Sequence, residues 1–197
     1  MSGRPTLSTQ RLWLSPANTS EAQALQSLWN EPDVRKFLWD DQAVTVERAR
    51  EAIEAGNASF RARGFGLWCV NLRHSGVLAG FCGLREFGER GEIEILFGLG
   101  PARTGLGYAT EAVHTVLAHA FGVCGLATVW GRTDEPNARS IRVLEKLGMK
   151  LKRTQAGKPF PIREYALAKA DFSPVPPPAP PREDDAVDKD FQKRREQ

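Results

Sequence analysis

The sequence predicts a mixed α/β domain with an antiparallel start and at least one strand–helix–strand crossover. Two patterns carry this prediction. Three apolar, strand-like segments follow one another in the middle of the chain, and after them helical and strand-like periodicities alternate. With 197 residues, of which 41% are hydrophobic and 26% charged, the chain has the size and composition of one soluble globular domain.

The N-terminal part of the chain predicts one short strand and two helices. Arg11–Leu14 begins as a strand. Ser20–Asn30 carries apolar residues at helical spacing, and we expect this helix to end before Pro32. Thr45–Arg63 is predicted to be the second helix, because Thr45 is a good N-cap and apolar residues recur on one face.

The middle of the chain predicts three strands, Phe65–Leu72, Val77–Phe87 and Glu92–Leu99. The first two are joined by Arg73–Gly76, a short turn that ends in glycine, so they are expected to form a hairpin.

The C-terminal part alternates helices and strands. Gly107–Phe121 has a strong helical pattern, with apolar residues at i, i+3, i+4 and i+7. It is followed by a strand at Thr128–Arg132 and a helix at Asn137–Leu147. Met149–Arg153 and Arg163–Ala168 close the domain as strands.

We expect the domain to comprise residues 1–172 and to be followed by a disordered tail. Ser173–Gln197 is rich in proline and then in charge, and it has few apolar residues. Such a segment cannot bury enough surface to offset the entropy lost on ordering.

Composition also narrows the location and the partners. The net charge of +3 suits one bound anion and is too small to indicate nucleic acid. No signal peptide is evident at the start and no apolar run approaches the about 20 residues of a membrane helix, so we expect a cytoplasmic protein without a membrane partner. Cys69, Cys82 and Cys124 have no metal-ligand spacing and are expected to be buried. A homodimer remains possible.

The segment with the clearest chemical meaning is Glu92–Ala112, in which a strand leads through a glycine-bearing loop directly into a helix. This arrangement aims unpaired backbone N–H groups and the positive end of a helix dipole at one point. Gly105 and Gly107 let an anion such as a pyrophosphate approach the backbone, and Arg103 adds a positive charge. A turn that merely caps the helix is the alternative.

Two other phosphate-binding motifs do not match this loop. The dinucleotide-binding fingerprint needs a third glycine at a position where this chain has Thr110. The P-loop needs Gly-Lys-Ser/Thr, which is absent.

Three segments together resemble the GNAT superfamily of N-acetyltransferases, in its RimJ/RimL-like (ribosomal-protein-alanine acetyltransferase) branch. Thr104–Ala109 reads TGLGYA and is similar to the acyl-CoA loop of the family, Gln/Arg-x-x-Gly-x-Gly/Ala, while its continuation GYATEA is typical of the branch. Asn137–Ser140 with Val143–Met149 resembles the Asn-x-x-Ser…Glu-Lys-Leu-Gly-Phe signature. Arg11–Pro16 resembles the Arg-Leu-x-Leu-Arg-Pro opening. These segments occur in the family's order, over residues 6–172.

The resemblance implies the GNAT fold, a mixed and mostly antiparallel sheet of about seven strands flanked by about four helices. It also implies that a bulge in Glu92–Leu99 splays this strand from Thr128–Arg132 and opens a cleft for acetyl-CoA, the cosubstrate, with no metal. The pantetheine arm would pair with the backbone of the first strand. The implied cofactor-binding residues are Phe97, Gly98, Leu99, Arg103, Thr104, Gly105, Leu106, Gly107, Tyr108, Ala109, Asn137 and Ser140.

Two positions depart from the family pattern. Thr104 stands where the loop usually has glutamine or arginine, which weakens one phosphate contact. Leu144 stands where many members have a tyrosine that protonates the leaving thiolate. The RimJ/RimL-like branch commonly lacks this tyrosine, so the second departure agrees with the branch.

Two residues are predicted to be catalytic. Glu94 matches a strand glutamate of many family members that accepts the amine proton, and its apolar neighbours are expected to raise its pKa. A purely structural glutamate, paired with an arginine, is the alternative. Ser140 can donate to the thioester sulfur or the thiolate, and Asn137 can act simply as a helix N-cap. His114 and His119 are expected at the surface.

The resemblance implies that the acceptor lies against Phe37–Asp41, where Trp39 can stack on a substrate and Asp40 or Asp41 can attract a cationic amine. A loop with one aromatic side chain anchored in the core is the alternative. The predicted function is acetyl transfer from acetyl-CoA by direct attack of a primary amine, either a protein N-terminus or a small molecule. Transfer of a longer acyl group and a catalytically degenerate acyl-CoA-binding regulatory module are the alternatives.

Overall fold

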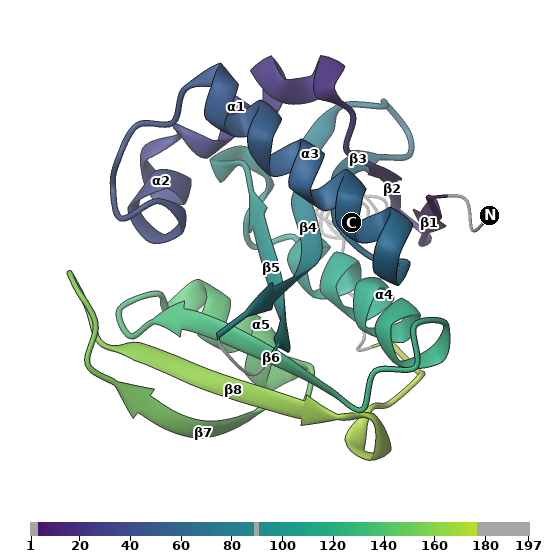
Figure 1. The fold of residues 1–197 in the computed structure, drawn as a ribbon, viewed down its shortest axis with the longest axis vertical. Coiled ribbons are helices and arrows are strands. Elements are labelled where there is room, and N and C mark those ends of the chain that lie inside the picture. Colours follow the sequence, from purple (N-terminus) through teal and green to yellow (C-terminus); the bar gives the residue numbers. More distant parts are fainter. Residues whose placement is uncertain (1–3, 89–90, 177–197) are drawn as a thin grey trace, which may run out of the picture.

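The computed structural model describes residues 4–88 and 91–176 of the chain, and eight strands form one sheet in the order β1-β2-β3-β4-β5-β6-β8-β7 (Figure 1). All neighbouring strands are antiparallel except β5 and β6, which run parallel. The strands are β1 (Leu7–Ser8), β2 (Leu12–Pro16), β3 (Leu67–Leu72), β4 (Leu78–Phe87), β5 (Glu92–Leu99), β6 (Thr128–Asp134), β7 (Lys150–Gln155) and β8 (Ile162–Ala168).

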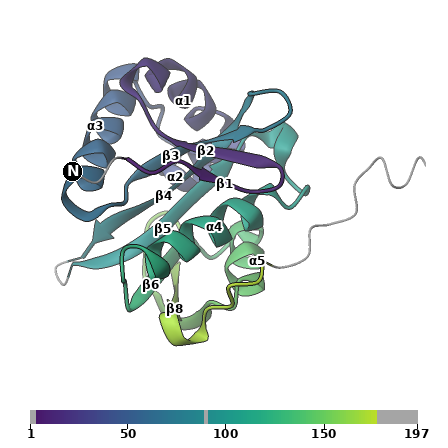
Figure 2. The same cartoon turned by 90° about the vertical axis from the view of Figure 1, so that its right-hand side faces the viewer.

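Helices cover both faces of this sheet. Figure 2 shows α1 and α3 on one face and α4 and α5 on the other. No helix in the described ranges is long and apolar enough to cross a membrane. The helices are α1 (Ala22–Trp29), α2 (Pro32–Leu38), α3 (Val46–Arg63), α4 (Tyr108–Gly122) and α5 (Ala138–Lys146), and short 3-10 turns lie at Thr19–Glu21, Pro101–Arg103 and Lys169–Asp171.

Strand β3 illustrates why the central strands are apolar on both sides. Trp68 and Val70 pack in the core under α4, whereas Leu67 and Cys69 pack in a second core under α1 and α3. Successive side chains of a strand point to opposite faces, so a strand covered on both faces needs a nearly continuous apolar sequence.

The predicted α/β architecture is confirmed, with one helix and one strand that the sequence did not reveal. The first helix ends before Pro32 as predicted, and Pro32 is in addition the first residue of the helix that was not predicted, α2. Proline suits this position because its fixed φ is helical and its missing N–H has no partner there anyway. The extra strand, β1, has two residues and pairs with Trp13 and Leu14.

The sheet opens between β5 and β6, but without the bulge expected in β5. The register of β5 against β4 runs from Phe87↔Glu92 to Gly80↔Leu99 without a shift. Among the described residues, β5 and β6 pair at two positions, and beyond Ile95 the strands diverge. β5 stays paired with β4, and β6 stays paired with β8 along its whole length. The twist of the sheet therefore separates β5 from β6.

His114 and His119, expected at the surface, are buried. The Nε2 atom of His119 lies 2.8 Å from the carbonyl oxygen of Gly64, and the ring meets Trp68 edge-on. His114 lies 3.0 Å from the carbonyl oxygen of Ser173 and packs against Phe172. Segments far away in the sequence cover this side of α4, and the helical pattern alone could not reveal them.

The three cysteines largely follow the prediction. Cys69 and Cys82 are fully buried, and burial raises the pKa of both thiols. Cys124 is half-buried, and all three are free thiols.

The predicted domain boundary at Ser173 is tested most cleanly by a chain that ends at Pro176, because Ser173 still contacts His114. Residues 177–197 lie outside the described residues. If they form no packed contacts, their removal should change the melting temperature by less than about 2 °C, which corresponds to under about 1 kcal/mol.

The matched control for this truncation is Phe172→Ala, which removes a ring that packs against Phe121 and His114. We expect it to cost about 2 kcal/mol or more, and therefore at least about 4 °C. A truncation that lowers the melting temperature as much as this control would show that the tail docks on the domain.

Candidate functional site

A cavity of about 930 Å³ opens where β5 and β6 diverge, and we call it the cleft. Protein pockets for small ligands range from about 300 to 1,000 Å³, so the cleft has room for a molecule as large as a coenzyme. Its walls come from the end of β5, the loop before α4 and the first turn of that helix, the end of β6, α5 and α2.

One wall of the cleft is the glycine loop, Thr104–Gly107, which leads into α4. Gly105 and Gly107 have φ values of 81° and 79°, in the left-handed region that side chains disfavour. A Cβ atom added at Gly105 would meet no atom within 4 Å, so a ligand can approach this backbone closely.

The glycine loop presents donors that have no partner. Among the described residues, the backbone N–H groups from Gly105 to Thr110 donate to no acceptor. They converge with the positive end of the α4 dipole, and this combination binds anions such as phosphates. The Thr104 hydroxyl is not available to such an anion in the same way, because it donates to the carbonyl oxygen of Pro101 at 2.9 Å.

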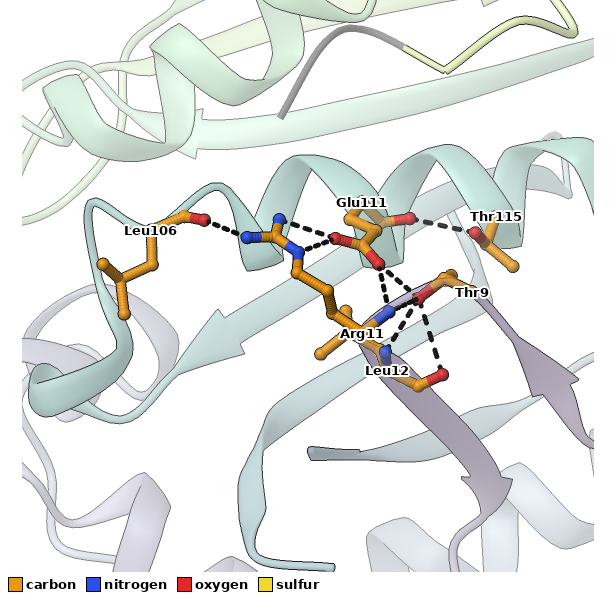
Figure 3. A network of polar contacts seen from close by, with 6 residues as sticks. All are labelled: Thr9, Arg11, Leu12, Leu106, Glu111 and Thr115. Atoms are coloured by element: carbon orange, nitrogen blue, oxygen red, sulfur yellow. Dashed lines mark hydrogen bonds and ion pairs between the residues drawn. The ribbon is translucent and has the colours of Figure 1, made fainter. Parts of the chain in front are cut away.

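Behind the loop, Arg11 joins β2 to the start of α4 (Figure 3). Its guanidinium pairs with Glu111, with Nε–Oε2 and Nη2–Oε2 distances of 2.7 and 2.6 Å. Its Nη1 donates to the carbonyl oxygen of Leu106 at 2.9 Å, and its charge lies over the ring of Tyr108, 4.6 Å from the centroid.

Glu94 lies at the point where β5 and β6 part, and it lines the cleft although only 2% of its surface is exposed. Its Oε1 accepts a hydrogen bond from Arg85 Nε at 2.6 Å, and its Oε2 lies 4.0 Å from Arg132 Nη1. Glu94 therefore pairs with arginine, as the structural alternative expects, and at the same time borders the cleft, as the catalytic hypothesis requires.

The row of charges continues across the sheet to Glu164 on β8. This second buried carboxylate is 3.3 Å from Arg132 Nε and accepts a hydrogen bond from Arg153 Nε at 2.6 Å. Glu164 does not line the cleft. The two glutamates thus share one arginine and a similar burial but differ in their access to the cleft.

The start of α5 contributes Asn137 and Ser140 to the cleft. Asn137 is the N-cap, since its Oδ1 accepts a hydrogen bond from Ser140 N at 3.2 Å. The Ser140 hydroxyl has no partner in the described part of the chain, so it remains available to a ligand. Farther along α5, Arg142 and Lys146 also line the cleft and place positive charge beside it.

The other end of the cleft is bordered by α2 and by Asp40, shortly after this helix. Phe37 lines the cleft, and the centroid of its ring is 6.4 Å from that of Phe160 in the β7–β8 connection. Asp40, with φ 51°, borders the cleft from this side and Asp134 from the end of β6. Burial raises the pKa of Asp134, and the negative charge of Asp40 raises it further. Two carboxylates from opposite walls therefore influence each other here.

Trp39 packs away from the cleft, which fits the core-anchor alternative. Its ring is 5.6 Å from that of Trp29 and lies under Arg48. Leu106 and Tyr108 also do not line the cleft, because the first offers its carbonyl group to Arg11 and the second packs against the core.

Eleven of the fifteen predicted site residues therefore meet around one cavity. The predicted residues that line the cleft are Asp40, Glu94, Phe97, Gly98, Leu99, Thr104, Gly105, Gly107, Ala109, Asn137 and Ser140, and those that do not are Trp39, Arg103, Leu106 and Tyr108.

Several residues that border the cleft were not singled out from the sequence. Arg85 and Arg132 reach Glu94 from neighbouring strands, and no local pattern predicts that meeting. Arg139, Arg142 and Lys146 recur at i, i+3 and i+7 on α5, and this spacing was a readable signal for a basic helix face. Among the described residues, no group of three or more His, Cys, Asp or Glu side chains is placed to hold a metal ion.

The chain is similar to known acetyltransferases over most of its length. Residues 11–150 match the family model described as acetyltransferase (GNAT) domain. An uncharacterized N-acetyltransferase of Bacillus licheniformis is 27% identical over 165 residues, which cover 83% of this chain and 89% of that protein. An uncharacterized N-acetyltransferase of Bacillus subtilis, YoaA, is 23% identical over 172 residues, which cover 84% of this chain and 97% of that protein.

Solved structures agree with this assignment at the level of the fold. A GNAT-family acetyltransferase from Bacillus anthracis superposes with a TM-score of 0.71 at 22% identity, over 84% of this chain and 99% of that one. RimL, a ribosomal L7/L12 α-N-protein acetyltransferase in complex with coenzyme A, superposes with a TM-score of 0.72 at 15% identity, over 83% of this chain and 98% of that one.

Proposed function

We propose a specific reaction for this chain, which belongs to the GNAT acetyltransferase family: it transfers the acetyl group of acetyl-CoA to a primary amine by direct attack. The observation that carries this proposal is the cleft itself. A glycine loop, whose N–H donors have no acceptor in the described part of the chain, borders one cavity of about 930 Å³ together with a buried carboxylate and a serine hydroxyl.

The residues of the cleft fit acetyl-CoA as the cosubstrate. The glycine loop and the first turn of α4 are suited to the pyrophosphate, and Arg142 and Lys146 line the same cavity with positive charge. The edge of β5 from Leu96 to Leu99 has no strand beside it on the cleft side among the described strands. This free edge can pair with the amide groups of the pantetheine arm.

In the proposed reaction the amine nitrogen attacks the thioester carbonyl carbon, the C–S bond breaks, and the amine loses a proton. Glu94 accepts this proton, directly or through water, because it is the buried carboxylate on the cleft wall. Ser140 donates a hydrogen bond to the sulfur as negative charge develops there, since its hydroxyl has no other partner among the described residues. Asn137 fixes the start of α5 and so the position of Ser140.

We propose an amine that is cationic in solution as the acceptor, either a protein N-terminus or a small molecule. Asp40 and Asp134 approach the cleft from opposite walls, and their mutual repulsion is relieved when a cation lies between them. The RimJ/RimL-like motifs and the likeness to a solved α-N-protein acetyltransferase support a protein N-terminus. A cytoplasmic location and a possible homodimer stay predictions from the sequence.

A second candidate function is an acyl-CoA-binding regulatory module without catalysis. One observation favours it: Glu94 is paired with Arg85, as a purely structural glutamate would be. Such a module would bind coenzyme A but would release no thiol from acetyl-CoA in the presence of amines.

Thiol release from acetyl-CoA, measured over a panel of amines, distinguishes the two functions. The panel should contain peptides with free N-termini, diamines, amino acids and aminoglycosides, with the same mixtures lacking amine as the control for hydrolysis. We expect amine-dependent release with at least one class. Calorimetric binding of coenzyme A without any release would favour the module, and absence of both would refute both functions.

A further inference from the structure

We propose that Arg11 is a positioning residue for the glycine loop: it fixes the Leu106–Gly107 peptide so that the Gly107 N–H points into the cleft. Arg11 does not line the cleft, and it contacts the glycine loop only through the Leu106 carbonyl group, on the side away from the cleft. The proposal rests on the proposed function, because the N–H group that Arg11 orients matters only if the glycine loop receives an anion.

The guanidinium of Arg11 is held in place from several sides (Figure 3). Besides the pair with Glu111, the backbone N–H of Arg11 donates to Glu111 Oε1 at 3.1 Å. Thr9 donates its hydroxyl to the same carboxylate oxygen and accepts the backbone N–H of Leu12 at 2.8 Å. With its side chain 20% exposed, Arg11 is thus fixed, and its Nη1 is directed at one target, the Leu106 carbonyl oxygen at 2.9 Å.

The geometry of the peptide bond turns this contact into an orientation of the loop. In a planar trans peptide the C=O of one residue and the N–H of the next point in opposite directions. Arg11 holds the Leu106 carbonyl on the β2 side, so the N–H of Gly107 must point to the other side. Gly107 lines the cleft and Leu106 does not, which places that side at the cleft.

The orientation of this peptide needs a specific contact, because Gly107 has a left-handed φ of 79°. Glycine populates positive and negative φ about equally, so a loop with two such glycines can turn its peptide planes at little cost. A hydrogen bond from a charged donor stabilises one of these arrangements over the others.

The charge of Arg11 has a second effect on the same site. Glu111 lies in the first turn of α4, where its negative charge would repel an anion bound at the helix N-terminus. The guanidinium neutralises this carboxylate while Glu111 fixes the guanidinium. Arginine can serve both partners because its planar group carries five donors, whereas lysine offers one compact charge.

The decisive experiment compares two acyl donors in Arg11→Met. Acetyl-CoA carries the pyrophosphate, and S-acetylpantetheine lacks it. We expect the KM for acetyl-CoA and the Kd of coenzyme A to rise about 10- to 100-fold, with kcat largely retained. The kcat/KM for S-acetylpantetheine should change by less than about twofold. Arg11→Lys, which can reach only one of the two partners, should fall in between.

Arg73→Met is the matched control. Arg73 also donates to a backbone carbonyl in this region, that of Thr9 at 2.8 Å, but it contacts neither the glycine loop nor Glu111. It should leave the preference between the donors unchanged. Equal losses with both donors in Arg11→Met, or an unchanged Kd of coenzyme A, would overturn the positioning role.

A second variant covers the case in which Arg11→Met folds poorly. Arg11→Lys keeps the positive charge beside Glu111 but cannot hold both partners, so it should raise the Kd of coenzyme A in the same direction by a smaller factor. A folded Arg11→Lys protein that binds coenzyme A like the native chain would overturn the proposal. Absence of coenzyme A binding by the native protein would instead refute the proposed function itself.

Discussion

Gly107→Glu is expected to weaken coenzyme A binding by at least about 100-fold while the domain still folds. The new carboxylate would stand at the N-cap of α4, beside N–H groups that have no acceptor among the described residues. It would oppose a bound anion there and occupy the approach to the backbone. A 100-fold loss corresponds to about 3 kcal/mol of binding free energy, measurable by calorimetry.

The control must separate this effect from backbone strain, because Gly107 has a left-handed φ. Gly125 has a φ of 67°, is exposed, and lies beyond the other end of α4 with no atom within 4 Å of an added Cβ. Gly125→Glu should therefore carry a similar backbone cost of about 1–2 kcal/mol and leave coenzyme A binding intact. Native-like binding by Gly107→Glu, or an equal loss in both variants, would refute the placement of the pyrophosphate.

Local sequence patterns predicted the parts of the fold whose causes are local. Glu92–Leu99 was placed with its observed bounds because an apolar run there ends in glycine and proline. The α4 helix was placed within one residue, since its apolar stripe is continuous. In both elements, the apolar residues that pack in the core can be recognised from the local sequence alone.

Other elements depend on contacts between distant segments, and the sequence predicted them poorly. Pro32 correctly indicated the end of one helix, but the sequence did not reveal that it also begins the next, α2, which lies beside the cleft. The two buried histidines of α4 looked like exposed polar positions, because their covering residues Gly64 and Ser173 are more than 50 residues away.

The residues of the candidate site likewise divide into those with local causes and those that depend on contacts between distant segments. Gly105, Gly107 and Asn137 were predictable, since a strand–loop–helix connection and an N-cap are local structures. The partners of Glu94 were not, because Arg85 and Arg132 meet it through the registers of three strands. The Arg11–Glu111 pair, 100 residues apart in the sequence, likewise needed the fold.

Glu94→Gln is expected to lower turnover by about 10²- to 10⁴-fold, with the Kd of coenzyme A nearly unchanged. Glutamine keeps the shape and can still accept a hydrogen bond from Arg85, but it cannot take up the amine proton. A free alkyl amine has a pKa near 10, so the residual rate should climb with pH as more acceptor loses its proton in water. Steady-state turnover between pH 6 and about 10 gives this profile.

Glu94→Gln also removes an ion pair, and this loss alone can lower stability or turnover. Glu164→Gln is the control that measures the effect of losing a buried ion pair. Glu164 is as buried as Glu94, pairs with Arg132 and Arg153 in the same row of charges, and does not border the cleft. Both variants remove hydrogen bonds to charged groups, and each should cost about 1–3 kcal/mol of stability. Only Glu94→Gln should lose turnover and alter the pH profile, because only its carboxylate can reach a bound amine. If both variants lose stability but retain native-like turnover at pH 7, Glu94 is a structural ion-pair partner, and proton removal passes to a water chain or to another group of the cleft.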